Sequence, residues 1–171
     1  MLGVMANAAL ALREKYPRIK IAVSKFGKSH NDLFNRAEER GIDIFNGPLP
    51  ALLMKSDLAL ITSGTATLEA ALLGVPMVVA YRASPLSYAI YKKFVTIKHI
   101  GLPNIVAGGA IVPECVQNDV TEQKLFETLD KFISEPQYRA KTIEALTALR
   151  ARLCERKPSE EVANIVCSHL T

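Results

Sequence analysis

Residues 57–76 read DLALITSGTATLEAALLGVP, and this stretch decides the fold. It begins as an apolar run of strand type, passes through Ser63, Gly64 and Thr65, and continues at once into a helical pattern that ends at Gly74. A strand that opens through small residues into a helix leaves backbone N–H groups uncovered at the helix N-terminus, where anions bind. The sequence therefore predicts a strand–turn–helix unit with an anion site at residues 63–65.

The same alternation of helix and strand continues on both sides of that unit. Strand-type runs occur at IKIAV (19–23), GIDIF (41–45) and PMVVAY (76–81), and helical patterns cover 2–16, 29–40 and 48–56. The four expected strands are apolar nearly throughout, as in a parallel sheet that is covered on both faces. The sequence therefore predicts an α/β fold with a doubly wound, Rossmann-like parallel sheet.

The alternation loosens beyond residue 81. A basic aromatic helix is expected from Pro85 to about Val95, followed by an irregular stretch, HIGLPNIVAGGAIVPECVQ (99–117). Irregular segments of that length in a compact domain are usually functional. Extra helices finish the chain: one carries an apolar stripe of Ile143, Leu146, Leu149 and Leu153, and another begins at Ser159 after Pro158.

Composition narrows the functional class. With 171 residues, 49% hydrophobic and 22% charged, the chain has the length and composition of one soluble globular domain. A net charge of +4, not gathered on one face, argues against a nucleic-acid partner. The three cysteines lack disulfide or zinc spacing, which fits a reducing cytosol, and no apolar run is long enough to span a bilayer.

Ligands of open α/β sheets bind at the carboxyl ends of the strands. Two loops are expected there: the loop of Ser63, Gly64 and Thr65, which offers N–H and hydroxyl donors, and the loop that begins at Arg82, which offers a charged fork. Glu69 is not part of a capping box, because residue 66 is Ala, so its carboxylate could accept hydrogen bonds from ribose hydroxyls. A plain capped helix with a surface glutamate is the alternative interpretation.

AVSKFGKS (22–29) matches a loose phosphate-binding P-loop pattern between a strand and a helix. Ala22 replaces the first glycine, and no later strand ends in an acidic residue that could hold magnesium. The sequence therefore argues against an ATP site there. His30, His99 and His169 are isolated and predict no metal site.

Two motifs together resemble a known family. SDLALITSGTATLEAALLGVPMVVAYR (56–82), followed by GLPNIVAGGAIVPECVQ (101–117), resembles the C-terminal half of the lipid-A-disaccharide synthases, over about residues 3–150. The resemblance implies one half of a GT-B fold: a Rossmann-like donor-nucleotide domain at 1–155 and a C-terminal helix at 156–171 that crosses over or contacts a second copy. It also implies that the family's N-terminal acceptor domain is absent from this chain.

The resemblance implies a reaction as well. Members of the family move 2,3-diacylglucosamine from its UDP conjugate to 2,3-diacylglucosamine 1-phosphate, with inversion, with release of UDP and with no metal or other cofactor. The catalytic residues are expected on the absent N-terminal domain. This chain alone is therefore expected to be inactive.

Site residues are carried over by position. The loop under the diphosphate corresponds to four residues, Ser63, Gly64, Thr65 and Ala66. Glu69 matches the ribose-binding acid, and Arg82 would lie near the phosphates. Three further polar positions line the family's cleft: Asn104, Glu114 and Gln117.

Partners follow from the same resemblance. It implies a cytoplasmic protein of a Gram-negative bacterium that touches the inner membrane peripherally and forms a homodimer through its C-terminal helices. The helix at 85–95 would face the lipid substrates or the membrane surface. No nucleic acid is expected. Two alternatives stay open: another UDP-sugar transferase or epimerase domain, and a non-catalytic nucleotide-binding or assembly module left by truncation.

Overall fold

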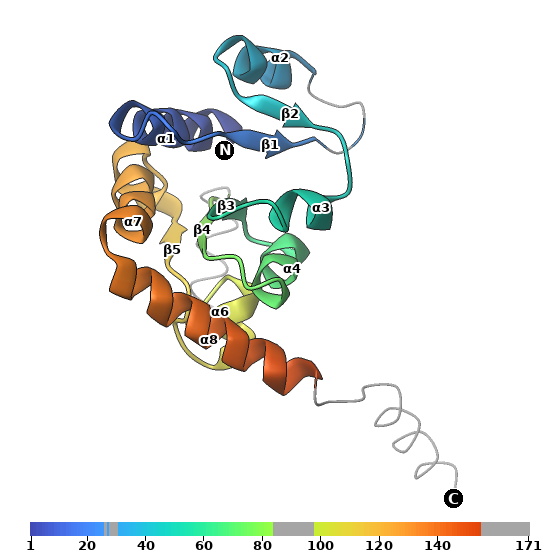
Figure 1. The fold of residues 1–171 in the computed structure, drawn as a ribbon, viewed down its shortest axis with the longest axis vertical. Helices are drawn as coiled ribbons and strands as arrows, with labels where there is room; N and C mark the ends of the chain where they lie inside the picture. The colour runs from blue at the N-terminus through green and yellow to red at the C-terminus, as the bar shows by residue number, and fades with distance from the viewer. Residues whose placement is uncertain (26, 28–30, 84–97, 155–171) are drawn as a thin grey trace, which may run out of the picture.

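The computed structural model describes residues 1–25, 27, 31–83 and 98–154 (Figure 1). The expected helices at 85–95 and 156–171, and part of the AVSKFGKS segment, lie outside these residues. In chain order the elements are α1 (Leu2–Lys15), β1 (Ala22–Ser24), α2 (Asn31–Glu39), β2 (Asp43–Phe45), α3 (Leu49–Leu53), β3 (Ala59–Thr62), α4 (Thr65–Leu72), β4 (Met77–Tyr81), α6 (Leu102–Ala107), β5 (Glu114–Val116), the 3-10 helix η1 (Gln117–Asp119), α7 (Glu122–Ser134) and α8 (Pro136–Cys154).

The strands form two parallel sheets, one of order β1-β2 and one of order β3-β4-β5. Strand β1 pairs with β2 from Ala22 opposite Asp43, and β3 pairs with β4 from Ala59 opposite Met77. Helices alternate with these strands along the chain. The predicted α/β class with parallel, Rossmann-like strands is confirmed.

Strand β4 lies at the centre of the core, because its successive side chains point alternately to two helical layers, one on each face of the sheet. Val78 and Ala80 pack with α1 and α7, whereas Met77 and Val79 pack with α3, α4 and α8. All four side chains are buried. The continuous apolar run of β4 is thus explained by cover on both faces, as in doubly wound sheets.

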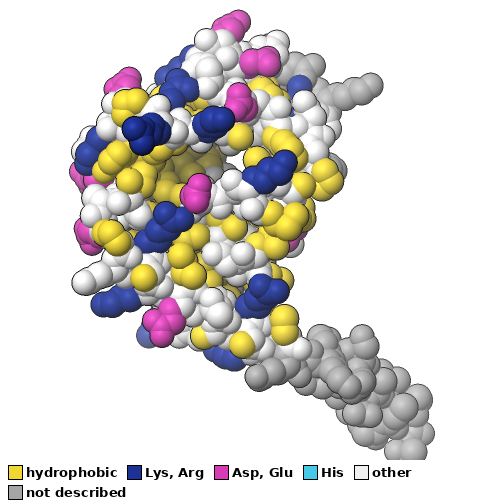
Figure 2. Space-filling model, viewed as in Figure 1, with side chains coloured by type: hydrophobic (Ala, Val, Ile, Leu, Met, Phe, Trp, Pro, Cys, Tyr) yellow, Lys and Arg dark blue, Asp and Glu magenta, His cyan; other side chains and the backbone are white. Residues whose placement is uncertain are grey.

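Strands β1 and β3 differ from this expectation. Their side chains are half-buried or exposed, although the sequence predicts strands covered on both faces. The physical reason is that β1 and β3 belong to different sheets, so each lies at an edge. Figure 2 shows a hollow floored by hydrophobic side chains between the α1–β1 region and β3, seen in the orientation of Figure 1.

The prediction of an irregular segment at 99–117 was wrong. This stretch contains α6, the strand β5 and η1. Strand β5 begins with a glutamate and has only three residues, so no apolar run or alternation marks it in the sequence. It becomes a strand because Glu114 and its neighbours pair in parallel with β4, opposite Val79.

The apolar stripe on α8 packs within this chain. Leu146 and Leu149 are buried against α4 and β4, and Leu153 packs on the same cluster. Ile143 is less well covered and remains 36% exposed. Most of this stripe is therefore already used by the chain's own core.

Candidate functional site

The loops after β3 and β4 lie side by side, as the sequence predicts. Thr62 pairs with Ala80, and the Ser63 N–H donates to the Ala80 carbonyl at 3.1 Å. Both loops therefore leave the sheet at its carboxyl edge, where ligands of open α/β sheets bind.

Helix α4 begins with backbone donors that no described residue covers. Gly64 is its N-cap, with φ 155° and ψ −171°, and no side chain caps the helix. The buried Thr67 donates through N–H and Oγ1 to the Gly64 carbonyl, at 3.1 and 2.7 Å, which fixes the turn. In the described part of the chain, the N–H groups of Gly64, Thr65 and Ala66 find no acceptor. Three donors at a helix N-terminus make this loop suitable for an anion.

The Ser63 hydroxyl forms a hydrogen bond with the loop that precedes α6. Its Oγ donates to the Ile100 carbonyl at 2.8 Å and is half-buried. That contact joins the end of β3 to the segment that enters α6. The hydroxyl proton of Ser63 is thus already used, so the open donors of the loop are the three amides and the exposed Thr65 hydroxyl.

Glu69 lies one helical turn beyond the loop. Its half-buried carboxylate makes no hydrogen bond or ion pair with any residue that the structure describes. Because residue 66 is Ala, the carboxylate has no capping-box role either. Its oxygens are available to accept hydrogen bonds from a ligand's hydroxyl groups.

Hydrogen bonds of Arg82 and Gln117 connect the end of β4 to η1. Arg82 Nη2 donates to the Val120 carbonyl at 2.6 Å, and its Nε donates to the Gln117 carbonyl at 3.4 Å. The Gln117 side chain accepts from the Ala83 N–H at 2.9 Å, and Gln117 itself has φ 54°. Arg82 therefore stands at the expected edge of the sheet, with part of its guanidinium engaged by backbone carbonyls.

The buried Asn104 and the half-buried Glu114 form a polar cluster. The Glu114 carboxylate accepts from the N–H groups of Ile100 and Gly101, each at 2.9 Å, and from Asn104 Nδ2 at 2.7 Å. Asn104 Nδ2 also donates to the Val112 carbonyl at 2.8 Å, while its Oδ1 accepts from the N–H groups of Ile111 and Val112 at 2.8 and 2.9 Å. Asn104 is fully buried, so its polar atoms serve the fold of this segment.

These contacts connect three of the expected site residues, Ser63, Asn104 and Glu114, whereas Arg82 and Gln117 form a separate pair. Ser63 binds the Ile100 carbonyl, and Glu114 binds the Ile100 N–H, so the loops after β3 and before α6 share one anchor on β5. Sequence reasoning missed Thr67 and Gly101. The signal for Thr67 is its position three residues after Gly64, where its N–H and hydroxyl both reach the N-cap carbonyl. A Cβ on Gly101 would lie only 3.1 Å from Glu114 Oε1 and Val79 Cγ2.

A family model described as Lipid-A-disaccharide synthetase matches residues 1–166. The chain belongs to the lipid-A-disaccharide synthetase family. A lipid-A-disaccharide synthase of Geobacter sulfurreducens is 34% identical over 173 residues, covering 99% of this chain and 45% of the relative. One of Hydrogenovibrio crunogenus is 38% identical over 144 residues, covering 81% of this chain and 38% of the relative.

The chain therefore spans less than half the length of these lipid-A-disaccharide synthases. One of Acidobacterium capsulatum, 39% identical over 103 residues, is covered to 26%. The match shows family membership, whereas the named activity is that of the longer relatives.

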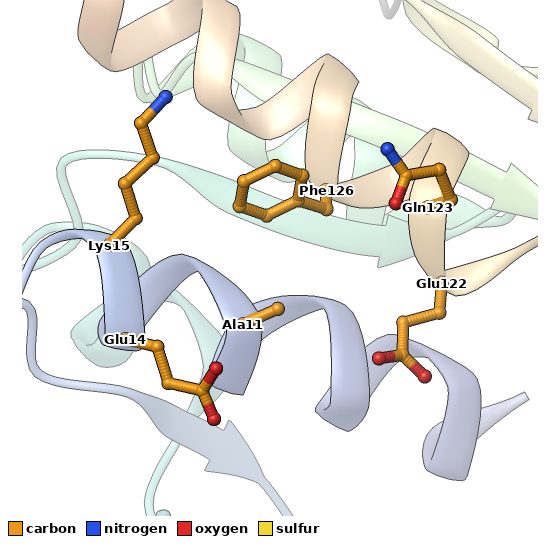
Figure 3. A pocket seen from close by; sticks show the side chains of 6 residues that line it. All are labelled: Ala11, Glu14, Lys15, Glu122, Gln123 and Phe126. Atoms are coloured by element: carbon orange, nitrogen blue, oxygen red, sulfur yellow. The ribbon is translucent and has the colours of Figure 1, made fainter.

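Elsewhere on this family member, a shallow groove lies between α1 and α7 (Figure 3). Its lining consists of Ala11, Glu14, Lys15, Glu122, Gln123 and Phe126. None of these belongs to the expected site. Figure 3 shows the Phe126 ring between Lys15 and Gln123, and the Lys15 ammonium is engaged by Asp130, at 2.8 and 2.9 Å from its two oxygens.

The described residues were also compared with the requirements for a metal site and for a membrane-spanning helix. No cluster of three His, Cys, Asp or Glu side chains suitable for a metal ion occurs among them. None of the described helices combines the length and apolar character needed to cross a membrane.

Proposed function

We propose that this chain is the donor-nucleotide half of a lipid-A-disaccharide synthase. In this role it binds the UDP portion of UDP-2,3-diacylglucosamine. One observation carries the proposal, the arrangement of donors and acceptor on α4. Three N–H groups at the start of this helix have no acceptor among the described residues, and one turn further along lies Glu69, which has no partner among them either.

The two parts of that arrangement suit the two parts of the nucleotide. Diphosphate oxygens would accept from the N–H groups of Gly64, Thr65 and Ala66, where the helix dipole favours negative charge. The Glu69 carboxylate would accept from the two ribose hydroxyls. A carboxylate so near an anion site repels the anion unless it binds such donors, which is why a ribose explains Glu69 better than a bare phosphate.

The same donors would assist the chemical step. When the sugar leaves UDP, negative charge accumulates on the diphosphate, and preorganised amides stabilise it without a metal ion. Arg82 would add positive charge at the adjacent strand end. Asn104, Glu114 and Gln117 would act by holding the surrounding loops, because their polar atoms bind backbone groups within the chain.

The acceptor, 2,3-diacylglucosamine 1-phosphate, and the catalytic residues are assigned to the part of the relatives that this chain does not match. We therefore expect the purified 171 residues alone to show no transfer of diacylglucosamine. A radiolabelled-donor assay tests this expectation, and any turnover would contradict it. The complete enzyme would act at the cytoplasmic side of the inner membrane, as a dimer joined through its C-terminal helices.

Calorimetric titration with UDP in the presence of EDTA tests the nucleotide site. We expect binding of UDP without metal and none of ATP with magnesium. ATP binding that requires magnesium would instead favour the AVSKFGKS segment and overturn the assignment. No binding of either ligand would contradict a self-sufficient UDP site at residues 63–69.

A further inference from the structure

Thr67 places a hydroxyl group on the buried face of α4. Its side chain has no exposed surface, and the same helix buries Ala70 and Ala71. A valine has nearly the same shape as a threonine and would fill this position without bringing a polar group into the interior, where such a group is costly unless it is hydrogen-bonded. Packing alone therefore does not account for the hydroxyl.

The hydrogen bond that this hydroxyl forms is redundant for the carbonyl that accepts it. Thr67 Oγ1 donates to the Gly64 carbonyl at 2.7 Å, and the Thr67 N–H donates to the same carbonyl at 3.1 Å. A buried carbonyl group is already satisfied by one such bond. Water cannot take the place of the hydroxyl, because the Thr67 side chain is fully buried. The second, shorter bond thus has its consequence elsewhere in the same peptide group.

The peptide group of the Gly64 carbonyl also contains the Thr65 N–H. The C=O and N–H of a trans peptide group point in opposite directions, so a carbonyl held toward Thr67 directs the Thr65 N–H outward from the start of α4. This N–H has no acceptor among the described residues. Hydrogen bonds in a chain polarise one another, so two donors on the carbonyl make the N–H at the other end a stronger donor.

Few other contacts fix the orientation of this peptide group. Gly64 has φ 155° and ψ −171°, no side chain caps the helix, and the place of a Cβ on Gly64 is open space. A glycine there permits a wide range of backbone angles. On the strand side, the loop is anchored by Ser63, whose N–H and hydroxyl donate to the carbonyls of Ala80 and Ile100. Thr67 is the corresponding anchor on the helix side.

We propose that Thr67 is a positioning residue for the diphosphate of the nucleotide. Its hydroxyl orients and polarises the peptide group between Gly64 and Thr65, which makes the Thr65 N–H a fixed and strong donor to a diphosphate oxygen. Thr67 itself does not touch the nucleotide, because its side chain is buried and its hydroxyl proton is already donated. The inference rests on the proposed function, since it takes UDP as the ligand of this loop.

Two substitutions separate the hydroxyl of Thr67 from its methyl group. Thr67→Val keeps the shape and removes the hydroxyl, whereas Thr67→Ser keeps the hydroxyl and removes a buried methyl group. In calorimetry with UDP and EDTA, we expect binding about 3- to 10-fold weaker for Thr67→Val and within about twofold of the unmodified chain for Thr67→Ser. The larger fall in Tm should occur in Thr67→Ser, because only that variant leaves a cavity. Unaltered UDP binding by Thr67→Val, or affinities that follow the Tm values, would overturn the proposal.

Thr142→Val is the matched control. Thr142 is buried on α8, and its Oγ1 donates to the Tyr138 carbonyl at 3.1 Å, so the substitution removes the same kind of bond from a different helix. UDP should bind this variant as it binds the unmodified chain. Equal weakening in the two valine variants would mean that any lost buried hydroxyl lowers affinity, which would overturn a specific role for Thr67.

The chemical shift of the Thr65 amide proton tests the same role without nucleotide. In an isotope-labelled chain we expect this signal to move upfield in Thr67→Val, because the N–H becomes a weaker donor, but not in Thr67→Ser or Thr142→Val. An unchanged signal in Thr67→Val would overturn the proposal. Failure of the unmodified chain to bind UDP would instead contradict the proposed function, and the Thr65 signal would still decide the role of Thr67, so the two failures are distinguishable.

Discussion

Asn104 and Glu114 share a hydrogen bond of 2.7 Å between Nδ2 and Oε1, and this bond joins α6 to β5. Around it, the two side chains together bind backbone groups of Ile100, Gly101, Ile111 and Val112. The helix α6 has only six residues and β5 only three, so they provide few backbone hydrogen bonds of their own. The side chains of Asn104 and Glu114 supply additional bonds to the backbone between them. The pair thereby holds Ile100 and Gly101 in place, next to the Ser63 hydroxyl that donates to the Ile100 carbonyl.

Replacing Asn104 with Ala should destabilise the fold strongly. The change leaves the N–H groups of Ile111 and Val112 and the Val112 carbonyl without their partner, and we expect a loss of about 2–4 kcal/mol in the free energy of unfolding. Urea denaturation measures it. The matched control is Asn118→Ala at an exposed position, which should change stability by no more than about 0.5 kcal/mol. Equal effects of the two substitutions would contradict the structural role.

Replacing Gly64 with Ala should strain the turn before α4. Gly64 has φ 155°, and no atom lies within 4 Å of the place that a Cβ would take, so the penalty comes from backbone conformation rather than crowding. We expect a loss of about 1–3 kcal/mol in stability, together with weaker UDP binding. Gly109→Ala is the control, because Gly109 has open space and no positive φ. Thermal denaturation of both variants decides between strain and a general intolerance of larger residues.

Replacing Glu69 with Ala should weaken UDP binding and spare stability. The carboxylate has no partner in the described structure, so its removal breaks no internal bond there, whereas two ribose hydroxyls would lose their acceptor. We expect binding weaker by about 1–3 kcal/mol in calorimetry and an unchanged Tm. Glu144→Ala, at an exposed position on α8, is the control and should bind UDP normally. A fall in Tm with unaltered binding would make Glu69 a structural residue.

The Lys15–Asp130 pair should give stability a pH dependence. The Lys15 ammonium, and secondarily the Tyr16 hydroxyl, hold the pKa of Asp130 below its ordinary value of 3.8 despite partial burial. A carboxyl with a lowered folded-state pKa stabilises above its unfolded pKa, and this stabilisation is lost as pH falls through the folded pKa. Asp130→Asn should therefore lower the Tm at pH 7 but make no difference well below pH 3.8.

The same pair sets an upper limit on that pH window. The pKa of Lys15 is raised above its ordinary value of 10.5, chiefly by its bond to Asp130, so the stabilisation should fade again at more alkaline pH. Asp57→Asn is the matched control, because Asp57 is 92% exposed and 3.5 Å from Arg139. Its Tm should be nearly insensitive to the change. Equal Tm profiles for the two variants would contradict a special role for Asp130.

The thiols should differ in reactivity. Burial raises the pKa of the Cys115 thiol, which is 2% exposed and 3.9 Å from Thr128 Oγ1, whereas Cys154 is exposed. In a Cys154→Ser, Cys167→Ser variant, the remaining thiol should react with a disulfide reagent only after unfolding. In a Cys115→Ser, Cys167→Ser variant, the thiol should react at once. Rapid labelling of Cys115 in the native state would show that β5 opens readily.

The local sequence was sufficient to predict β3, the turn after it and α4, because neighbouring residues define these elements. The apolar run before Ser63, the small residues through Thr65 and the helical pattern up to Gly74 specify strand, turn and helix within one short segment, and the structure confirms β3 and α4 there. Gly74, with φ 72°, ends the unit as a glycine should. Uncovered amides follow from that local geometry alone, so the expected anion loop needed no long-range information.

Contacts between segments far apart in the chain decided the structure around β5 and the burial of β3. Glu114 becomes a strand residue only because β4 offers it a parallel partner, and Asn104 becomes a buried brace only because Glu114 and Val112 close around it. Likewise, the apolar sequence of β3 predicts a strand covered on both faces, whereas its half-burial depends on whether a strand lies beside it. Sequence periodicity reports which residues favour burial, but the partner that buries them is chosen by packing between segments far apart in the chain.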